Sequence, residues 1–155
     1  MPFPPKLEVM SEHTDLIELV DSIFDAVDAK DWDTAETLFE PAVYVDFSSL
    51  GGGEPATISN VQLVDGWRQG LHPKKKSFHL VGHYRVRTDG DIATVAVKGY
   101  AYNVLDEDLG GGMWEVWGAY DIPLRRTEAG WKAAGIAFRA WHSRGDESVR
   151  THVLS

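Results

Sequence analysis

Apolar residues recur at helical spacing in the first part of the chain. Within residues 13–30 they fall three or four positions apart, which predicts one helix with a single buried face. These positions are Leu16, Val20, Ile23, Phe24 and Val27. A shorter helix is predicted over residues 32–39, because the Asp31 carboxylate can accept free N–H groups of its first turn. A third helix is predicted from Ser59 or Asn60 to residue 71.

Patterning of the β type begins at residues 42–47 and dominates the second half of the chain. After a glycine-rich loop, four long β segments are separated by short turns and one looser connection. The segments are 77–88, 91–105, 113–127 and 130–143. Short turns between long strands indicate antiparallel pairing. The order of elements therefore predicts an α+β fold: a cone-shaped, curved antiparallel sheet with about three N-terminal helices packed on its concave face.

A chain of 155 residues is long enough for one domain with a sizeable core. Residues 1–11 are rich in proline and are predicted to form a flexible N-terminal arm. Residues 12–143 form the single α+β cone domain, and residues 144–155 are predicted to be a polar C-terminal tail.

Charge and composition narrow the possible partners. A net charge of -9 and the lack of a long basic cluster argue against nucleic acid and anionic membranes as partners. No apolar run has signal-peptide or membrane-span length, so we expect a cytoplasmic protein. The chain has no cysteine, and its histidines show no metal-site spacing, so neither a metal nor a cofactor is expected.

An acid at a helix end and a histidine on a later strand form the central functional hypothesis. Asp28 ends the first predicted helix, and His79 lies on the second predicted strand. An imidazole can act as a base near neutral pH, and a carboxylate bonded to its far nitrogen would fix the tautomer. The alternatives are that Asp28 is solvated or caps the next turn, and that His79 is a packed or exposed strand residue.

Strand alternation leaves the orientation of His79 open. His79 shares one strand face with Val81 and His83, whereas Phe78 and Leu80 share the other. Either the polar face lines a cavity or a bulge redirects His79. His83 is a candidate second base, with an exposed position as the alternative.

Aromatic residues on the predicted strands suit a cavity for a small, flat hydrophobic molecule. The predicted substrate-binding residues are Tyr44, Asp46, Tyr102, Trp114 and Tyr120. Tyr44 and Tyr102 are the predicted hydrogen-bond donors to a substrate oxygen. Asp46 is either at the cavity rim or outward-facing, and the aromatic residues could instead form core.

Four motifs carry a family resemblance. They are 28–33 (DAKDWD), 39–41 (FEP), 78–82 (FHLVG) and 125–132 (RRTEAGWK). On these motifs, residues 12–142 resemble the nuclear transport factor 2-like, or SnoaL-like, superfamily. That superfamily includes isomerases, dehydratases, cyclases, epoxide hydrolases and binding modules, so the fold alone does not define an activity.

Within this superfamily the chain most resembles the branch of scytalone dehydratase, hexachlorocyclohexane dehydrochlorinase and bile-acid 7α-dehydratase. The Asp–His dyad of that branch matches Asp28 and His79 by motif position. Val27 and Phe47 stand where scytalone dehydratase has tyrosines, which implies a different substrate. In the comparison with ketosteroid isomerases, Asp46 matches the position of their base. Isoleucines stand at the positions of their oxyanion-hole residues, so this chain would lack those hydrogen-bond donors.

The resemblance implies a cofactor-independent lyase, dehydratase-like, in which His79 is the general acid/base and Asp28 orients it. The alternatives are a polyketide cyclase or isomerase with the same dyad, and a non-catalytic binding or assembly module. The resemblance also implies a homo-oligomer, with a trimer favoured over a dimer.

Overall fold

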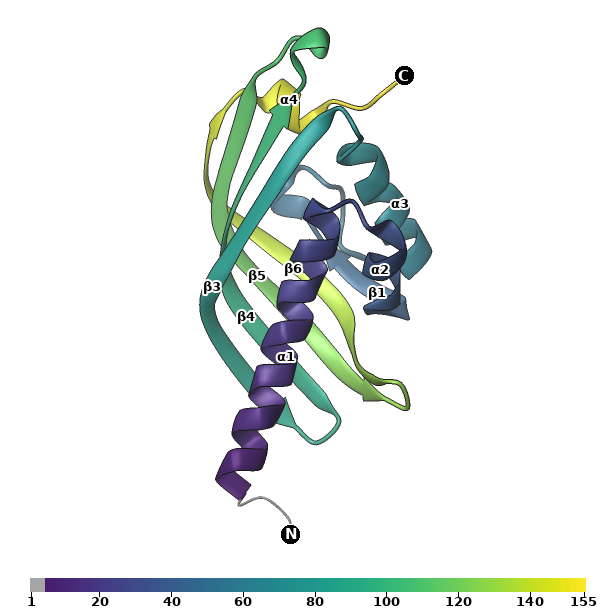
Figure 1. The fold of residues 1–155 in the computed structure, drawn as a ribbon, viewed down its shortest axis with the longest axis vertical. Coiled ribbons are helices and arrows are strands. Elements are labelled where there is room, and N and C mark those ends of the chain that lie inside the picture. Colours follow the sequence, from purple (N-terminus) through teal and green to yellow (C-terminus); the bar gives the residue numbers. More distant parts are fainter. Residues whose placement is uncertain (1–4) are drawn as a thin grey trace.

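A long helix lies across one face of a curved sheet (Figure 1). The computed structural model describes residues 5–155. Its helices are α1 (Pro5–Asp28), α2 (Trp32–Thr37), α3 (Asn60–Gly70) and the short α4 (Glu147–Thr151). The first three helices cover the same face of the sheet, which confirms the predicted α+β architecture with helices on one side.

Six strands form an open sheet in the order β2-β1-β6-β5-β4-β3. They are β1 (Phe39–Asp46), β2 (Ala56–Ser59), β3 (Lys75–Asp89), β4 (Ile92–Leu105), β5 (Met113–Thr127) and β6 (Gly130–Gly145). Neighbouring strands are antiparallel except β1 and β6, which are parallel. The sheet is therefore mixed, whereas the sequence pattern predicted a wholly antiparallel sheet. No hairpin connects β1 to β6, so turn geometry does not dictate their direction.

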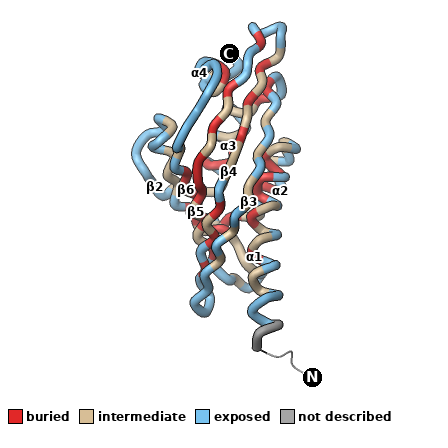
Figure 2. Tube along the Cα trace, turned by 90° about the vertical axis from the view of Figure 1, so that its left-hand side faces the viewer, coloured by how far each residue is buried: buried red, intermediate tan, exposed pale blue. Residues whose placement is uncertain are grey.

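The buried face of α1 is the one that the sequence predicts. All five apolar positions of its stripe are at most 5% exposed and belong to the core between helix and sheet (Figure 2). Burying each such side chain contributes about 1.5–3 kcal/mol, so this stripe is a main attachment of α1 to the sheet. No helix within residues 5–155 is long and apolar enough to cross a membrane.

The N-terminus differs from the prediction of a flexible arm over residues 1–11. Helix α1 already begins at Pro5, so residues 5–11 are helical. Proline is well suited to the first turn of a helix, where its missing N–H would have no partner, and Glu8 is favourable in that turn. Residues 1–4 lie outside the described residues.

The C-terminus also corrects the prediction of a polar tail over residues 144–155. Strand β6 continues to Gly145, and α4 then packs against the body of the molecule with Val149 fully buried. His72 Nε2 lies 2.9 Å from His152 Nδ1 and ties the end of the chain to the start of β3. A single buried valine creates no repeating hydrophobic pattern along the chain, and the residues it packs against are distant in sequence. The sequence pattern around residue 149 therefore could not predict this packing.

Lys75 should make stability depend on pH. Its buried amino group donates to the Arg150 carbonyl at 3.1 Å and the His152 carbonyl at 2.9 Å. Burial, together with the charges of Lys30 and Arg150, lowers the pKa of Lys75 from 10.5 to about 8. Between these values the unfolded chain binds the proton and the folded chain does not. The free energy of unfolding should therefore rise as pH increases from about 8 to 10.5, and the cost of the buried charge is fully present below pH 8.

Urea unfolding of wild type and Lys75→Met, measured below and well above pH 8, tests this expectation. Wild type should gain stability relative to Lys75→Met as the pH rises. Lys76→Met is the matched control, because Lys76 is the exposed neighbour on the same strand, and it should follow wild type. Parallel pH profiles for wild type and Lys75→Met would contradict the prediction.

Candidate active site

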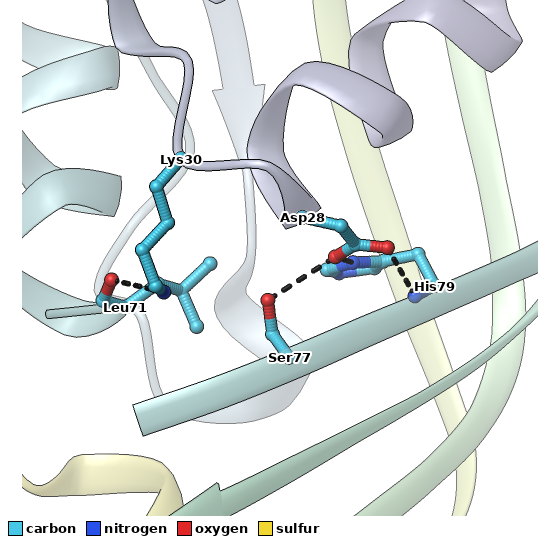
Figure 3. Close-up of polar contacts among 5 residues, drawn as sticks. All are labelled: Asp28, Lys30, Leu71, Ser77 and His79. Atoms are coloured by element: carbon cyan, nitrogen blue, oxygen red, sulfur yellow. Dashed lines mark hydrogen bonds and ion pairs between the residues drawn. The ribbon is translucent and has the colours of Figure 1, made fainter. Parts of the chain in front are cut away.

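Asp28 at the end of α1 and His79 on β3 are in direct contact (Figure 3). His79 Nδ1 lies 2.7 Å from one Asp28 carboxylate oxygen, and the His79 backbone N–H donates to the other at 2.7 Å. The Ser77 hydroxyl donates to the first oxygen at 3.1 Å. Because an ionised carboxylate only accepts hydrogen bonds, this geometry places a proton on Nδ1 and leaves Nε2 as the free nitrogen. The side chains of Asp28 and His79 are 22% and 14% exposed.

The turn after α1 fixes the position of Asp28. Asp28 is the last residue of α1, and Lys30 adopts the left-handed conformation with φ of 56°. The Lys30 amino group donates to the Leu71 carbonyl at 2.6 Å, just beyond α3 (Figure 3). Burial lowers the pKa of Lys30, and the charge of Asp28 opposes that shift. Lys30 thus ties the end of α1 to the end of α3 and places a cation close to Asp28.

A bulge in β3 resolves the orientation of His79. The register of β3 with β4 shifts between Gly82 and Arg85, and His83 has a φ of 56° there. Before the bulge His79 faces the helices, and after it Tyr84 faces them, with its hydroxyl donating to Asp21 on α1. The odd-numbered residues of β3 therefore face the helices before the bulge, and the even-numbered residues face them after it. His83 is exposed and pairs with Arg85 at 2.9 Å, away from Asp28.

His79 is part of the wall of a cavity of about 470 Å³ between the sheet and α3. This size falls within the range of small-molecule sites. Most of the lining is apolar or aromatic, including Phe47, Leu63, Trp67, Ala101, Val116 and Phe138. Within residues 5–155, no group of three or more histidine or acidic residues is arranged to hold a metal ion.

Two glycines make room for the aromatic floor of this cavity. A Cβ at Gly99 would lie 2.7 Å from the Tyr120 ring, and one at Gly118 would lie 2.8 Å from the Phe138 ring. Tyr120 packs against Phe138 and against Phe24 of α1, with ring centroids 4.5 and 4.8 Å apart. Burial, with the nearby charge of Asp28, raises the pKa of Tyr120, so its hydroxyl stays protonated at neutral pH.

The structure places only some of the predicted substrate-binding residues in the cavity. Trp114 and Tyr120 line it. Tyr44 is 44% exposed on β1, and Asp46 accepts hydrogen bonds from the Ser48 backbone N–H at 3.0 Å and its hydroxyl at 2.6 Å. Neither of these lines the cavity, so their predicted placement is corrected.

Tyr102 also lies elsewhere. It stacks on Phe78 with ring centroids 5.5 Å apart, on the sheet face opposite His79. Because alternate strand residues point to opposite faces, the inward residues of this part of β4 are Ala101 and Asn103. The prediction of Tyr102 is therefore wrong by one position along the strand, because its neighbours Ala101 and Asn103 line the cavity instead.

The sequence reasoning missed Ser77 and Asn103. Ser77 contacts Asp28, and Asn103 lines the cavity while only 7% exposed. Both were in principle visible: Ser77 lies two positions before His79, on the same strand face, and Asn103 is a polar residue inside an otherwise apolar and aromatic stretch. Their significance depends on knowing which strand face is concave.

A curved open sheet with helices on one face and a cavity between the two layers defines the nuclear transport factor 2-like class of folds. Within that class, the chain belongs to the SnoaL-like domain family, which matches residues 8–136. The membership confirms the family that the sequence motifs indicated.

Similar proteins extend over most of the chain. Rv2910c, an uncharacterised protein of Mycobacterium tuberculosis H37Rv, is 27% identical over 139 residues, which cover 79% of this chain and 81% of that protein. The crystal structure of Kfla4162 from Kribbella flavida matches with a TM-score of 0.86 and 23% identity, over 92% of this chain and 98% of that one. Hexachlorocyclohexane dehydrochlorinase LinA-type3 from Novosphingobium barchaimii LL02 matches with a TM-score of 0.72 and 14% identity, over 91% and 94%.

Proposed function

We propose that this protein is a cofactor-independent lyase, dehydratase-like, that acts on a small hydrophobic carbonyl compound. The observation that carries the proposal is the His79–Asp28 contact at 2.7 Å, with His79 also in the wall of an apolar cavity. A histidine held by a carboxylate on one nitrogen is an effective general base through the other nitrogen.

The proposed reaction follows from this arrangement. His79 Nε2 removes a proton next to the carbonyl of the substrate, and the C–H electron pair forms an enolate. Asp28 stabilises the imidazolium that results. The enolate then expels a β-hydroxyl group as the C–O bond breaks, and His79 returns its proton so that water leaves. Proton transfer by a positioned histidine contributes roughly 10²–10⁴-fold to a rate.

Several structural relatives have lyase names, which is in line with the proposal. Besides the dehydrochlorinase, a protein of Novosphingobium aromaticivorans DSM 12444 provisionally named scytalone dehydratase shares the fold, with a TM-score of 0.74 and 14% identity over 94% of this chain and 91% of that one. Dehydrochlorination and dehydration both remove a proton and a leaving group from adjacent carbons. The same fold with an acid–histidine contact beside a cavity is consistent with such chemistry here.

Flat β-hydroxy ketones incubated with the protein in D₂O provide the test. Dehydration predicts a product lighter by one water, detected by mass spectrometry, and reversible enolate formation adds deuterium at the carbon next to the carbonyl of the recovered substrate, detected by NMR. His79→Gln should lose both signals. His83→Asn is the matched control, because His83 is an exposed histidine on the same strand and asparagine tolerates its positive φ.

Other outcomes identify the alternatives. A product of unchanged mass would indicate a cyclase or isomerase, which begins with the same proton removal. Binding without any change in product mass and without deuterium exchange across the panel would indicate a non-catalytic binding module and would overturn the proposal.

We also propose that a second copy of the chain covers the convex sheet face. That face carries a groove of about 490 Å³ whose lining includes Tyr100, Trp117, Leu80 and Trp141, and the last two are each 60% exposed. Exposed apolar clusters of this kind are typical of interaction surfaces. Light scattering should report a mass above the 17.2 kDa of one chain, and a monomer would contradict this.

A further inference from the structure

Asn103 is a buried polar residue whose side chain has no protein partner. Only three polar or charged residues among those described are buried: His72, Lys75 and Asn103. His72 and Lys75 both make side-chain hydrogen bonds. Asn103 makes none to any residue of the described chain, although it is only 7% exposed. Its amide is not among the fully buried unpaired atoms of the described residues, so it is accessible from the cavity that Asn103 lines, and a small ligand there can bind it.

The sheet register places this amide beside the proposed base. Asn103 of β4 pairs with Ser77 of β3 and with Trp114 of β5, while His79 pairs with Ala101. His79 and Asn103 are therefore diagonal neighbours on one sheet face, roughly 7–8 Å apart and somewhat closer between their Cβ atoms. Both line the same cavity. A small ligand can contact both side chains at once.

The cavity lining also contains neutral polar side chains besides Asn103, namely Gln62, Trp114 and Tyr120. The Tyr120 hydroxyl has no hydrogen-bond partner among the described residues, and Trp114 Nε1 is buried without one. No aspartate or glutamate is among the lining residues. Apolar walls with two neutral groups that can donate, the Asn103 amide and the Tyr120 hydroxyl, suit a ligand that presents an acceptor oxygen on an apolar body.

The arginine in the cavity lining is already paired with a carboxylate. Arg150 lines the cavity, but its Nε donates to Glu147 at 2.7 Å and its Nη2 lies 2.5 Å from the same carboxylate oxygen. Its charge is therefore compensated within α4. This favours an uncharged acceptor such as a ketone over a carboxylate.

We propose that the Asn103 carboxamide binds the carbonyl oxygen of an uncharged, flat, apolar ligand. This inference rests on the proposed function and names its substrate class, a neutral ketone or aldehyde with a C–H next to the carbonyl. Asn103 donates an N–H to the carbonyl oxygen, and the adjacent carbon lies toward His79 Nε2. As the proton leaves, negative charge grows on that oxygen, so the hydrogen bond strengthens toward the enolate.

Calorimetry with three probes of the same shape tests this assignment without catalysis. The probes are 2-acetylnaphthalene, 2-isopropenylnaphthalene, in which a methylene replaces the carbonyl oxygen, and 2-naphthoate. Wild type should bind the ketone about 2- to 10-fold more tightly than the alkene, the range for one net hydrogen bond. Asn103→Leu should bind both alike. Tyr102→Phe is the matched control, since it removes a neighbouring hydroxyl from the opposite face, and it should keep the preference.

Each other outcome overturns the assignment. A ketone preference that survives in Asn103→Leu would assign the oxygen to Tyr120 or Trp114. Tighter binding of naphthoate would indicate that Arg150 recognises an anion, and equal or absent binding of ketone and alkene in wild type would exclude carbonyl recognition. Asn103→Ala, which adds space instead of bulk, replaces the leucine variant if that variant does not fold.

The proposed function can fail separately. His79→Gln should keep the preference for the ketone over the alkene, because that preference comes from the Asn103 N–H and not from the base. If wild type prefers the ketone but neither dehydrates nor exchanges deuterium with any substrate, the lyase proposal falls and Asn103 remains the carbonyl-binding residue of a binding module.

Discussion

Asp28→Asn should reduce the proposed turnover about 10²–10⁴-fold while the protein remains folded. The Asp28 carboxylate accepts from His79 Nδ1 at 2.7 Å and from the His79 backbone at 2.7 Å. An asparagine has one acceptor oxygen where the carboxylate has two, and its NH₂ group can donate a hydrogen bond to Nδ1. The proton of His79 would then move to Nε2, the nitrogen that must accept the substrate proton.

Two measurements separate this effect from simple damage to the fold. Ring ¹⁵N chemical shifts of His79 report which nitrogen carries the proton, and they should change between wild type and Asp28→Asn. Asp25→Asn is the control, because Asp25 is an exposed acid one turn earlier on α1, and both turnover and the His79 shifts should stay as in wild type. Wild-type turnover in Asp28→Asn would refute the orienting role.

Gly118→Ala should be among the most destabilising single changes in the sheet. A Cβ at this position would lie 2.2 Å from the backbone oxygen of Arg139 and 2.8 Å from the Phe138 ring. The backbone of β6 cannot move without breaking its pairing with β5, so the loss should reach or exceed about 3 kcal/mol, the upper end for overpacking. Urea unfolding measures it directly.

Gly99→Ala and Gly66→Ala provide graded controls for that measurement. At Gly99 the closest atom is Cε2 of the Tyr120 ring at 2.7 Å, a side-chain atom that can shift, so a smaller loss is expected. Nothing lies within 4 Å of a Cβ at Gly66 in α3, where alanine should gain about 0.5–1 kcal/mol. Equal stability of all three variants would show that β5 and β6 can separate locally without cost.

Part of the candidate site was predictable because it depends on local signals. The end of α1 follows from the apolar stripe of residues 16–27 and the turn after it, which places Asp28 at a helix terminus. His79 lies in a recognisable strand motif. Their pairing was inferred from family motif positions, since no local rule links residues so far apart in sequence.

The remaining site residues required the tertiary structure because both faces of the sheet carry aromatic side chains. Trp114 and Tyr120 point into the cavity, whereas Tyr102 points to the opposite face. Alternation tells which residues share a face, but it is symmetric and does not tell which face is covered by helices. The bulge at His83 then exchanges the two faces within β3.

By itself, the sequence determined the class of fold, the helix faces and most strand boundaries, because hydrophobic periodicity and turn chemistry act over a few residues. Only the tertiary structure decided that β1 runs parallel to β6, that α4 packs back onto Lys75, and that Asn103 stands beside His79. These features depend on contacts between residues that are distant along the chain. These features are stabilised by the burial of side chains and by long-range hydrogen bonds, which a pattern over a few neighbouring residues cannot predict.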